Sequence, residues 1–279
     1  MLKPYGYFGL ALVVFAEINF SLKIQPFAAW YIPIVWYGFI LFVDSVVFRI
    51  KKKSIISTYP KEFVLMLVVS VPFWLIFELY NFFTVSWIYT NYVWYLHLVD
   101  FTTIMPAVLE VFSLISALGI ASSLDSMKNH AGKTRSSTPL QSAVIKFLVA
   151  VGAFAVVIPI LAPVIGFPLM WIGIFLFIDP LNYLTGKPSI IAKVSKGSKG
   201  ILIRLFLSGI VMGFFWEFWN FQAYPKWTYN LPSFVPAIKL FEMPLLGYLG
   251  YLPFAIEVFL FYALLRSFVF NYENPLLSM

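Results

Sequence analysis

The chain of 279 residues is dominated by apolar side chains: 61% of its residues are hydrophobic, 11% are charged, and the mean hydropathy is +0.89. A soluble globule of this size needs more polar surface than this composition supplies, so most of the chain is expected to lie in lipid. The net charge of +7 does not indicate a nucleic-acid partner, because most of the basic residues fall in loops on one side of the expected membrane spans.

Apolar stretches of about 20 residues, the length that crosses a bilayer as a helix, predict eight membrane spans. In chain order they cover approximately residues 5–22, 27–48, 62–80, 99–122, 143–165, 167–184, 201–221 and 243–270. The expected fold class is therefore an all-α polytopic membrane protein. Two aromatic segments, 87–97 and 224–241, are too polar to span, and their Trp and Tyr side chains are typical of the membrane interface.

Loop charges predict the orientation of these spans. If the N-terminus is cytoplasmic, the cytoplasmic loops carry nearly all the cations, including the run 51–53, and only Lys23, Lys226 and Lys239 lie outside. This asymmetry follows the positive-inside rule, so we expect a multi-pass protein of the cell membrane with both termini in the cytoplasm. The basic loops are expected to contact anionic lipid headgroups.

Comparison of the chain with itself reveals an internal repeat. Three blocks recur in the same order: 36–44 as 171–179, 77–82 as 216–221, and 106–112 as 253–259. The pattern predicts a first four-helix repeat over 1–121, a cytoplasmic linker over 122–142 and a second four-helix repeat over 143–279. Because four is an even number, the two repeats would have parallel orientations in the membrane.

Six acidic residues inside the expected spans are present in both repeats, although a charged side chain at a helix centre costs about 2.5 to 3.5 kcal/mol on insertion scales. They form the pairs Asp44 and Asp179, Glu78 and Glu217, and Glu110 and Glu257. Asn81 and Asn220 each lie three residues after a Glu of the second pair, so an amide and an acid project from one helix face.

Loss of hydration favours the neutral form of a carboxyl group in lipid, and a neutral acid can donate a proton. Hydrogen bonding between helices is the structural alternative for the two Glu pairs. For Asp44 and Asp179, which lie near the cytoplasmic ends of their helices, contact with basic loops or capping of a local turn is favoured. The chain has no zinc-binding His-Glu-x-x-His, Walker, paired-Asp or serine-elbow motif, so no metal and no cofactor is expected.

Several blocks of the second repeat resemble the membrane lycopene cyclase domain of the heterodimeric or fused type. They are Trp216-Glu217-Phe218-Trp219-Asn220, then Trp227-x-Tyr229, then Gly250-Tyr251-Leu252-Pro253 followed by Glu257 and an aromatic run. The sequence departs from that family in having one acid four residues after the proline, Glu217 in place of an Asp, and an extra helix in each repeat.

The resemblance implies cofactor-independent cyclisation of a hydrophobic isoprenoid or lipid-like substrate. Glu217 and Glu257 would be the proton donor and acceptor, and Glu78 and Glu110 would form a second or vestigial site. Supporting roles would fall to Asn81, Asn220, Trp216, Trp219, Trp227, Tyr229, Asp44 and Asp179. Two other classes of function stay open: a proton-coupled transporter or channel built from parallel repeats, and a membrane binding or assembly protein without chemistry.

Overall fold

The computed structural model describes residues 1–91, 93–125, 139–231 and 238–277, so most of the expected linker over 122–142 lies outside the described residues. Six segments of this part of the chain are long and apolar enough to cross a membrane. They are α2 (Tyr31–Lys51), α4 (Pro60–Thr84), α5 (Trp94–Ala117), most of α6 (Pro139–Leu161), α10 (Gly200–Gln222) and the continuous pair η3 (Leu245–Gly250) and α11 (Tyr251–Val269). The expectation of a helical multi-pass membrane protein is confirmed.

Two of the eight expected spans differ from this simple pattern. The first coincides with α1 (Pro4–Ser21), which is not among the membrane-capable segments. The sixth is interrupted: α7 (Pro163–Gly166) and η2 (Phe167–Trp171) meet α8 (Gly173–Leu184) at a bend of 49°. The described residues therefore contain six segments that could cross a membrane, or seven if this bent pair is one span.

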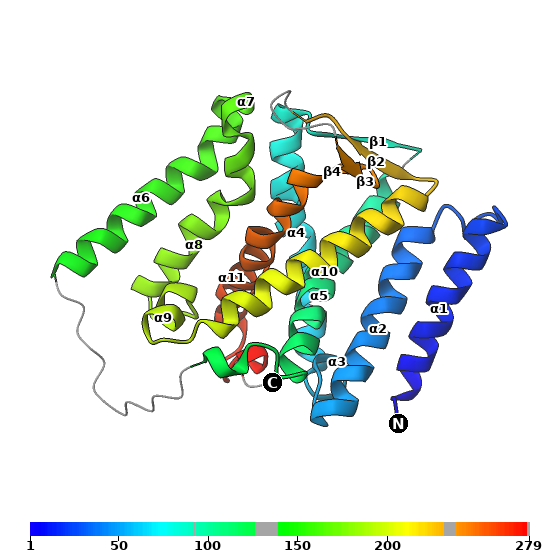
Figure 1. The fold of residues 1–279 in the computed structure, drawn as a ribbon, viewed down its shortest axis with the longest axis horizontal. Helices are drawn as coiled ribbons and strands as arrows, with labels where there is room; N and C mark the ends of the chain where they lie inside the picture. The colour runs from blue at the N-terminus through cyan, green and yellow to red at the C-terminus, as the bar shows by residue number, and fades with distance from the viewer. Residues whose placement is uncertain (92, 126–138, 232–237, 278–279) are drawn as a thin grey trace.

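Helices pack in matching pairs in the two halves of the chain. In the N-terminal half α1 packs on α2 and α4 on α5, and in the C-terminal half α6 packs on α8 and α10 on α11 (Figure 1). Both outer pairs cross at glycines: a Cβ on Gly38 would lie 2.7 Å from the Gly9 carbonyl oxygen, and one on Gly152 would lie 2.4 Å from that of Leu176. Small residues let membrane helices approach this closely.

The two halves meet mainly where α5 packs on α10, and α11 also contacts α5, with the Phe112 and Phe259 rings 5.6 Å apart. Two short strands also join them, β1 (Trp87–Thr90) and β2 (Lys226–Tyr229), which pair antiparallel at the end of the bundle opposite both termini (Figure 1). A second strand pair, β3 (Lys239–Leu240) with β4 (Met243–Pro244), precedes η3. The aromatic segments expected at the membrane interface thus contain β1, β2 and β3.

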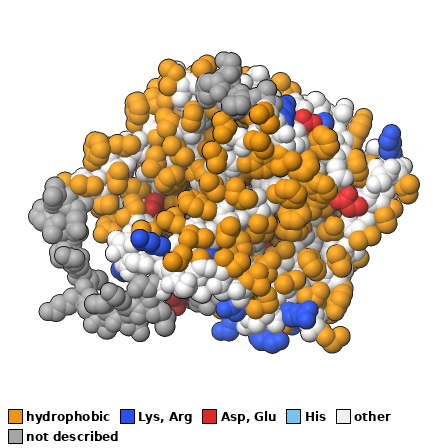
Figure 2. Space-filling view, viewed as in Figure 1, with side chains coloured by type: hydrophobic (Ala, Val, Ile, Leu, Met, Phe, Trp, Pro, Cys, Tyr) orange, Lys and Arg blue, Asp and Glu red, His pale blue; other side chains and the backbone are white. Residues whose placement is uncertain are grey.

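Charged side chains on the visible surface gather mainly at its edges. Figure 2 shows a face covered mainly by hydrophobic side chains, with basic groups along the lower edge, where Figure 1 places the termini, and a smaller charged group at the upper right. The side chains of 51–53, just after the second helix, are exposed. Two short helices, α3 (Ile55–Thr58) and α9 (Ile190–Ser195), follow α2 and α8.

Asp125 ties the end of the first half to the start of α10. Its carboxylate accepts hydrogen bonds from the Ser198 hydroxyl (2.7 Å) and the Gly200 amide (3.1 Å) and pairs with Arg204 at 2.7 Å. Partial burial alone would raise the pKa of Asp125, but these hydrogen bonds and the Arg204 charge outweigh it and hold the pKa below its usual range. The contact fixes one end of the segment that joins the halves.

A buried ion pair also links the two halves. Arg266 near the end of α11 lies 2.7 Å from Glu62 in the first turn of α4, and Tyr262 donates a second hydrogen bond to the same carboxylate. Glu62 is fully buried and the Arg266 side chain is 5% exposed. The sequence suggests ordinary loop charges at both positions, because each lies next to a helix end.

We expect Arg266→Met to lower the free energy of unfolding by about 3 to 5 kcal/mol, because it leaves the Glu62 carboxylate buried without its partner. The double variant Glu62→Leu with Arg266→Met should recover much of this loss, since no charge then stays buried. Thermal unfolding in detergent measures both, with Lys61→Met at the neighbouring exposed position as control. A double variant as unstable as the single one would contradict this explanation.

Candidate active site

Each paired strand is held to the preceding helix by one asparagine. The Asn220 amide nitrogen donates to the Trp227 carbonyl (2.8 Å), and its oxygen accepts from the Trp227 backbone N–H (2.9 Å). Asn81 makes the same two bonds to Trp87, both at 3.0 Å. These amides, which the sequence suggests as partners of the acids, satisfy backbone groups and fix where each strand starts.

The strand pairing places the two Trp-x-Tyr motifs opposite one another. Trp87 lies across from Tyr229, and Tyr89 lies across from Trp227. Because residues two apart in a strand share a face, all four side chains point to one side of the strand pair. This side faces the interior of the bundle, where Glu78 and Glu217 lie.

Glu217 is fully buried and is covered by two tyrosines. The hydroxyls of Tyr229 (2.5 Å) and Tyr251 (2.7 Å) both donate to its Oε1, and the Trp227 indole N–H donates to the Tyr229 hydroxyl at 2.8 Å. The second oxygen, Oε2, is buried and has no close hydrogen-bond partner in the part of the chain that the structure describes. Burial and the adjacent Glu217 raise the pKa of Tyr229 well above its usual value, so this hydroxyl keeps its proton near neutral pH.

Glu78 has an equivalent arrangement in the first half. Its Oε1 accepts from the Tyr89 hydroxyl (2.5 Å) and from the indoles of Trp74 (2.8 Å) and Trp87 (3.3 Å). In the repeat alignment the position of Trp74 corresponds to Gly213, where a Cβ would lie 2.3 Å from the Tyr251 ring. Glycine there makes room for Tyr251, which supplies from α11 the donor that Trp74 supplies from α4.

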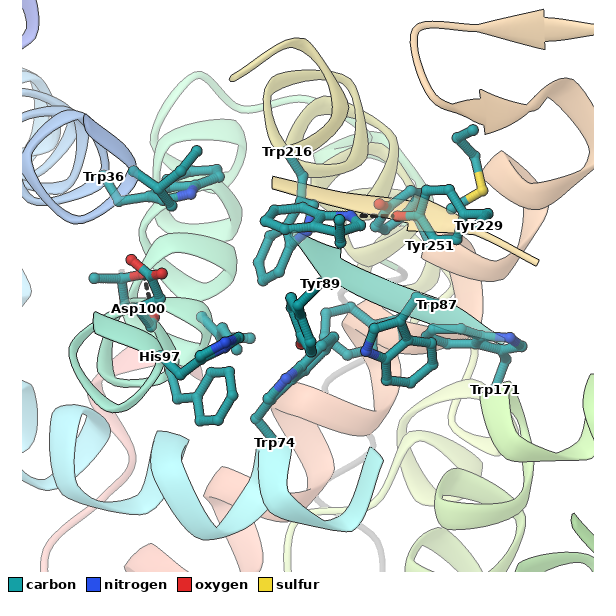
Figure 3. A pocket seen from close by; sticks show the side chains of 17 residues that line it. Trp36, Trp74, Trp87, Tyr89, His97, Asp100, Trp171, Trp216, Tyr229 and Tyr251 are labelled. Atoms are coloured by element: carbon teal, nitrogen blue, oxygen red, sulfur yellow. Dashed lines mark hydrogen bonds between the residues drawn. The ribbon is translucent and has the colours of Figure 1, made fainter. Parts of the chain in front are cut away.

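An aromatic cavity lies between these two carboxyl groups (Figure 3). Its walls come from both halves and contain the following rings: Trp36, Trp74, Trp87, Tyr89, His97, Phe101, Trp171, Trp216, Trp227, Tyr229, Tyr251 and Phe254. The Trp216 ring lies 5.7 Å from that of Trp36 and 5.6 Å from that of Trp74, so it joins the two walls. No Lys or Arg lines the cavity among the described residues.

The cavity has two different ends. Figure 3 shows Trp36 with Asp100 and His97 at one end and Trp171 at the other, with Trp216 and Tyr89 between them. Asp100 is the acidic residue that lines the cavity directly. It was not among the residues expected from the sequence, because it has no acidic counterpart in the second half.

The other sequence-predicted residues lie outside the cavity wall. Glu257 is fully buried on α11, where its Oε1 accepts a 3.4 Å bond from the Phe175 amide and its Oε2 has no partner. Glu110 is fully buried beside Asp44, and neither of its oxygens reaches a donor among the described residues. The fold thus brings Glu217 together with Glu78 across one cavity and does not bring Glu217 into contact with Glu257.

Asp44 and Asp179 cap the two short helices. Asp44 accepts from the Ile56 amide (2.9 Å) and the Ser54 hydroxyl (2.8 Å), and Asp179 accepts from the amides of Ile190 (2.7 Å) and Ile191 (3.0 Å). Carboxylates satisfy free N–H groups at helix starts in this way.

Trp219 packs against the cavity wall from behind. It is buried behind the cavity wall, with its ring 4.6 Å from that of Trp36. It therefore supports a lining residue and does not itself face the cavity.

Comparison of the chain with protein-family models, with curated proteins and with solved structures finds no match. The functional argument therefore rests on the geometry of the cavity and its carboxyl groups.

We expect Asn220→Leu to destabilise the protein, because it removes both bonds to Trp227 and leaves two backbone groups without partners, at roughly 1 to 3 kcal/mol each. The checks are the melting temperature in detergent and hydrogen exchange at the Trp227 amide, which should become faster. Asn91→Gly is the control, since Asn91 is exposed, its side chain makes a 3.5 Å bond, and glycine accepts its positive φ of 57°. Unchanged exchange at Trp227 would show that other contacts hold the strand.

Proposed function

We propose that this protein is a cofactor-independent membrane enzyme that closes a ring in an isoprenoid by transferring a proton to one of its double bonds. The observation that carries the proposal is the aromatic cavity flanked by two Glu–Tyr pairs, the fully buried Glu217 with Tyr229 and the half-buried Glu78 with Tyr89. Such a site offers a proton source on its wall and ring faces around the position where positive charge would develop.

The proton would reach the substrate through a tyrosine. Glu217 does not line the cavity, but Tyr229 and Tyr251 do, and both bond its carboxyl group. When Glu217 is neutral, the hydrogen bond reverses: the carboxyl group donates to the Tyr229 oxygen and the Tyr229 hydroxyl turns to the alkene. Tyr229 then gives its hydroxyl proton to the alkene, whose π electrons form the new C–H bond, while Glu217 gives its proton to the Tyr229 oxygen and becomes a carboxylate. A second double bond attacks the tertiary cation to form the ring.

Loss of a proton from a neighbouring carbon to the pair formed by Tyr89 and ionised Glu78 forms the product double bond. A proton then passes from Glu78 back to Glu217 before the next turnover. Tyr89 with Glu78 lies on the opposite part of the wall and serves as the base, with Tyr89 receiving the proton as it passes its own to Glu78. The reaction is an isomerisation, so atoms balance without a metal, a nucleotide or a redox partner. This assignment pairs Glu217 with Glu78, where the sequence suggests a pair of Glu217 and Glu257.

Aromatic rings favour a cationic intermediate because their faces carry negative electrostatic potential, with about 2 kcal/mol or more per desolvated contact. Trp216 is the central ring, in contact with Trp36, Trp74 and Trp227. The remaining lining residues are apolar apart from His97, Asp100 and Thr103, so water is largely excluded.

The arrangement in the membrane proposed with this function is two tandem parallel repeats, 1–121 and 143–279, in the cell membrane. Matching glycine crossings, asparagine bonds and aspartate caps in the two halves support the duplication, and α1 packed along α2 would be the eighth span. The basic edge that holds both termini would face the cytoplasm and its anionic lipid headgroups.

Expression in a lycopene-accumulating host, followed by pigment analysis, tests the reaction. We expect a cyclised product from the native chain and a loss of about 100-fold or more with Glu217→Gln or Glu78→Gln, the range for removal of a general acid or base. Glu17→Gln is the matched control, since Glu17 lies on α1 and bonds Tyr31, away from the cavity wall. Unchanged pigment with the native chain would reject a carotenoid substrate. In a separate assay, solute uptake into vesicles that is driven by an acid gradient and requires Glu217 would favour a carrier.

We expect Trp216→Leu to reduce turnover by about 30-fold, which corresponds to the loss of about 2 kcal/mol of cation stabilisation, while Trp216→Phe keeps most of it. Initial rates in membranes, normalised to protein content, measure the difference. Trp219→Phe, behind the wall, is the control. Equal rates for the Leu and Phe variants would show that the ring acts by shape alone.

A further inference from the structure

A second cavity continues the first toward the surface. Its lining comes from η2, from η3 and the start of α11, and from residues in or next to β1, β2 and β4. The lining residues are Ser86, Trp87, Phe167, Pro168, Trp171, Ile172, Tyr229, Leu231, Met243, Leu246, Gly247, Leu249, Gly250 and Pro253. Trp87, Trp171, Tyr229 and Met243 line both cavities. The two spaces therefore meet at the end of the aromatic cavity farthest from Asp100 (Figure 3).

The lining of the outer cavity is that of a lipid-facing groove. No charged residue lines it among the described residues, and its two sides belong to membrane-capable segments, the bent pair 163–184 and the span 245–269. Leu246 and Leu249 on one side are 52% and 58% exposed, and Ile165, just before the other side, is 80% exposed. Exposed leucine and isoleucine at this depth are stable in contact with hydrocarbon and not with water.

Among the described residues, such an opening lies beside Trp171 and not beside Trp36, its counterpart in the N-terminal half. Trp171 and Trp36 occupy the same position in the repeat, yet Trp36 is 2% exposed and is enclosed by Phe39 and Trp219. Trp36 lies within the unbroken α2, whereas Trp171 lies where the corresponding span bends by 49°. Because of this bend, η2 does not continue the axis of α8, and Trp171 lies between the two cavities.

From this continuity we propose that the two cavities form one site for a long linear hydrocarbon chain that enters sideways from the bilayer between η2 and η3. One end of the chain lies among the tryptophans next to Tyr89 and Tyr229, and the rest extends past Trp171 and Met243 into lipid. The inference rests on the proposed function for the chemistry at the inner end, but occupation of the groove can be measured without turnover.

Photocrosslinking of the native chain in phosphatidylcholine vesicles tests the groove. The probe is a linear fatty ester with a diazirine near its methyl end, and adducts are mapped by mass spectrometry. We expect adducts on Trp171 and Met243, which is 5% exposed, in addition to adducts on outward residues such as Phe154, which is 65% exposed. Adducts confined to outward residues would overturn the proposal.

Gly250→Phe is the variant that should close the groove. A Cβ at Gly250 would lie 3.6 Å from Trp171, an ordinary contact, and the backbone there has a negative φ of −65°, so a larger side chain extends into the opening without backbone strain. We expect loss of the Met243 and Trp171 adducts with unchanged labelling of Phe154. Leu79→Phe, on an exposed position of α4, should leave all adducts in place.

Failure of the proposed reaction and failure of the proposed groove give different results. Inner adducts that Gly250→Phe removes, in a chain that makes no cyclised product, would keep the groove and reject the proposed reaction. Product formation that survives Gly250→Phe, with no inner adducts in the native chain, would keep the reaction and reject the groove.

Discussion

A polypeptide at a membrane interface must find a partner for every backbone N–H and C=O group that water does not reach, and this constraint shapes the site. β1 and β2 meet it by pairing with each other, while Asn81 and Asn220 satisfy the groups of Trp87 and Trp227. The same bonds fix the positions of Tyr89 and Tyr229, since each lies two residues along its strand. The cavity wall, the hydroxyls over the carboxyl groups and the junction of the halves thus depend on one short stretch of strand.

Similarity of the two halves is accompanied by specific differences that define the site. Trp74 and Gly213 occupy one repeat position, and the glycine admits Tyr251 as the second donor to Glu217. Trp36 is sealed within an unbroken helix, whereas the bend beside Trp171 opens the outer cavity. The halves therefore hold equivalent Glu–Tyr pairs but different surroundings, which suits a donor on one side and an acceptor on the other.

Much of this architecture is readable from the sequence, and the limits have physical reasons. Hydropathy predicts the helical spans, and the recurrence of Glu78 and Asn81 as Glu217 and Asn220 singles out the groups around the cavity. The pairing of β1 with β2 is not predictable, because two four-residue strands far apart in the chain have no local signal for register. The opposite ends of the Glu62–Arg266 ion pair resemble loop charges for the same reason, since only the fold brings α4 and α11 together.

Helix orientation accounts for the different positions of Glu217 and Glu257. Both are fully buried carboxyl groups in membrane-capable helices, and hydropathy gives each the same cost. Which one approaches the cavity depends on the rotation of α10 and α11 about their axes, and the uniformly apolar faces of such helices do not encode that rotation. Glu257 instead lies against the backbone of α8 at Phe175.

The proposed chemistry also fits the electrostatics of a site without cations. A neutral acid in an apolar wall is inexpensive, and transfer of its proton to a double bond creates a carboxylate and a carbocation together. At low dielectric such a pair is strongly attractive, so neither charge is isolated. A Lys or Arg in the wall would stabilise the carboxylate and repel the carbocation, whereas the described lining offers aromatic faces and Asp100, both of which favour positive charge. The composition of the cavity thus selects for a cationic intermediate beside a buried acid.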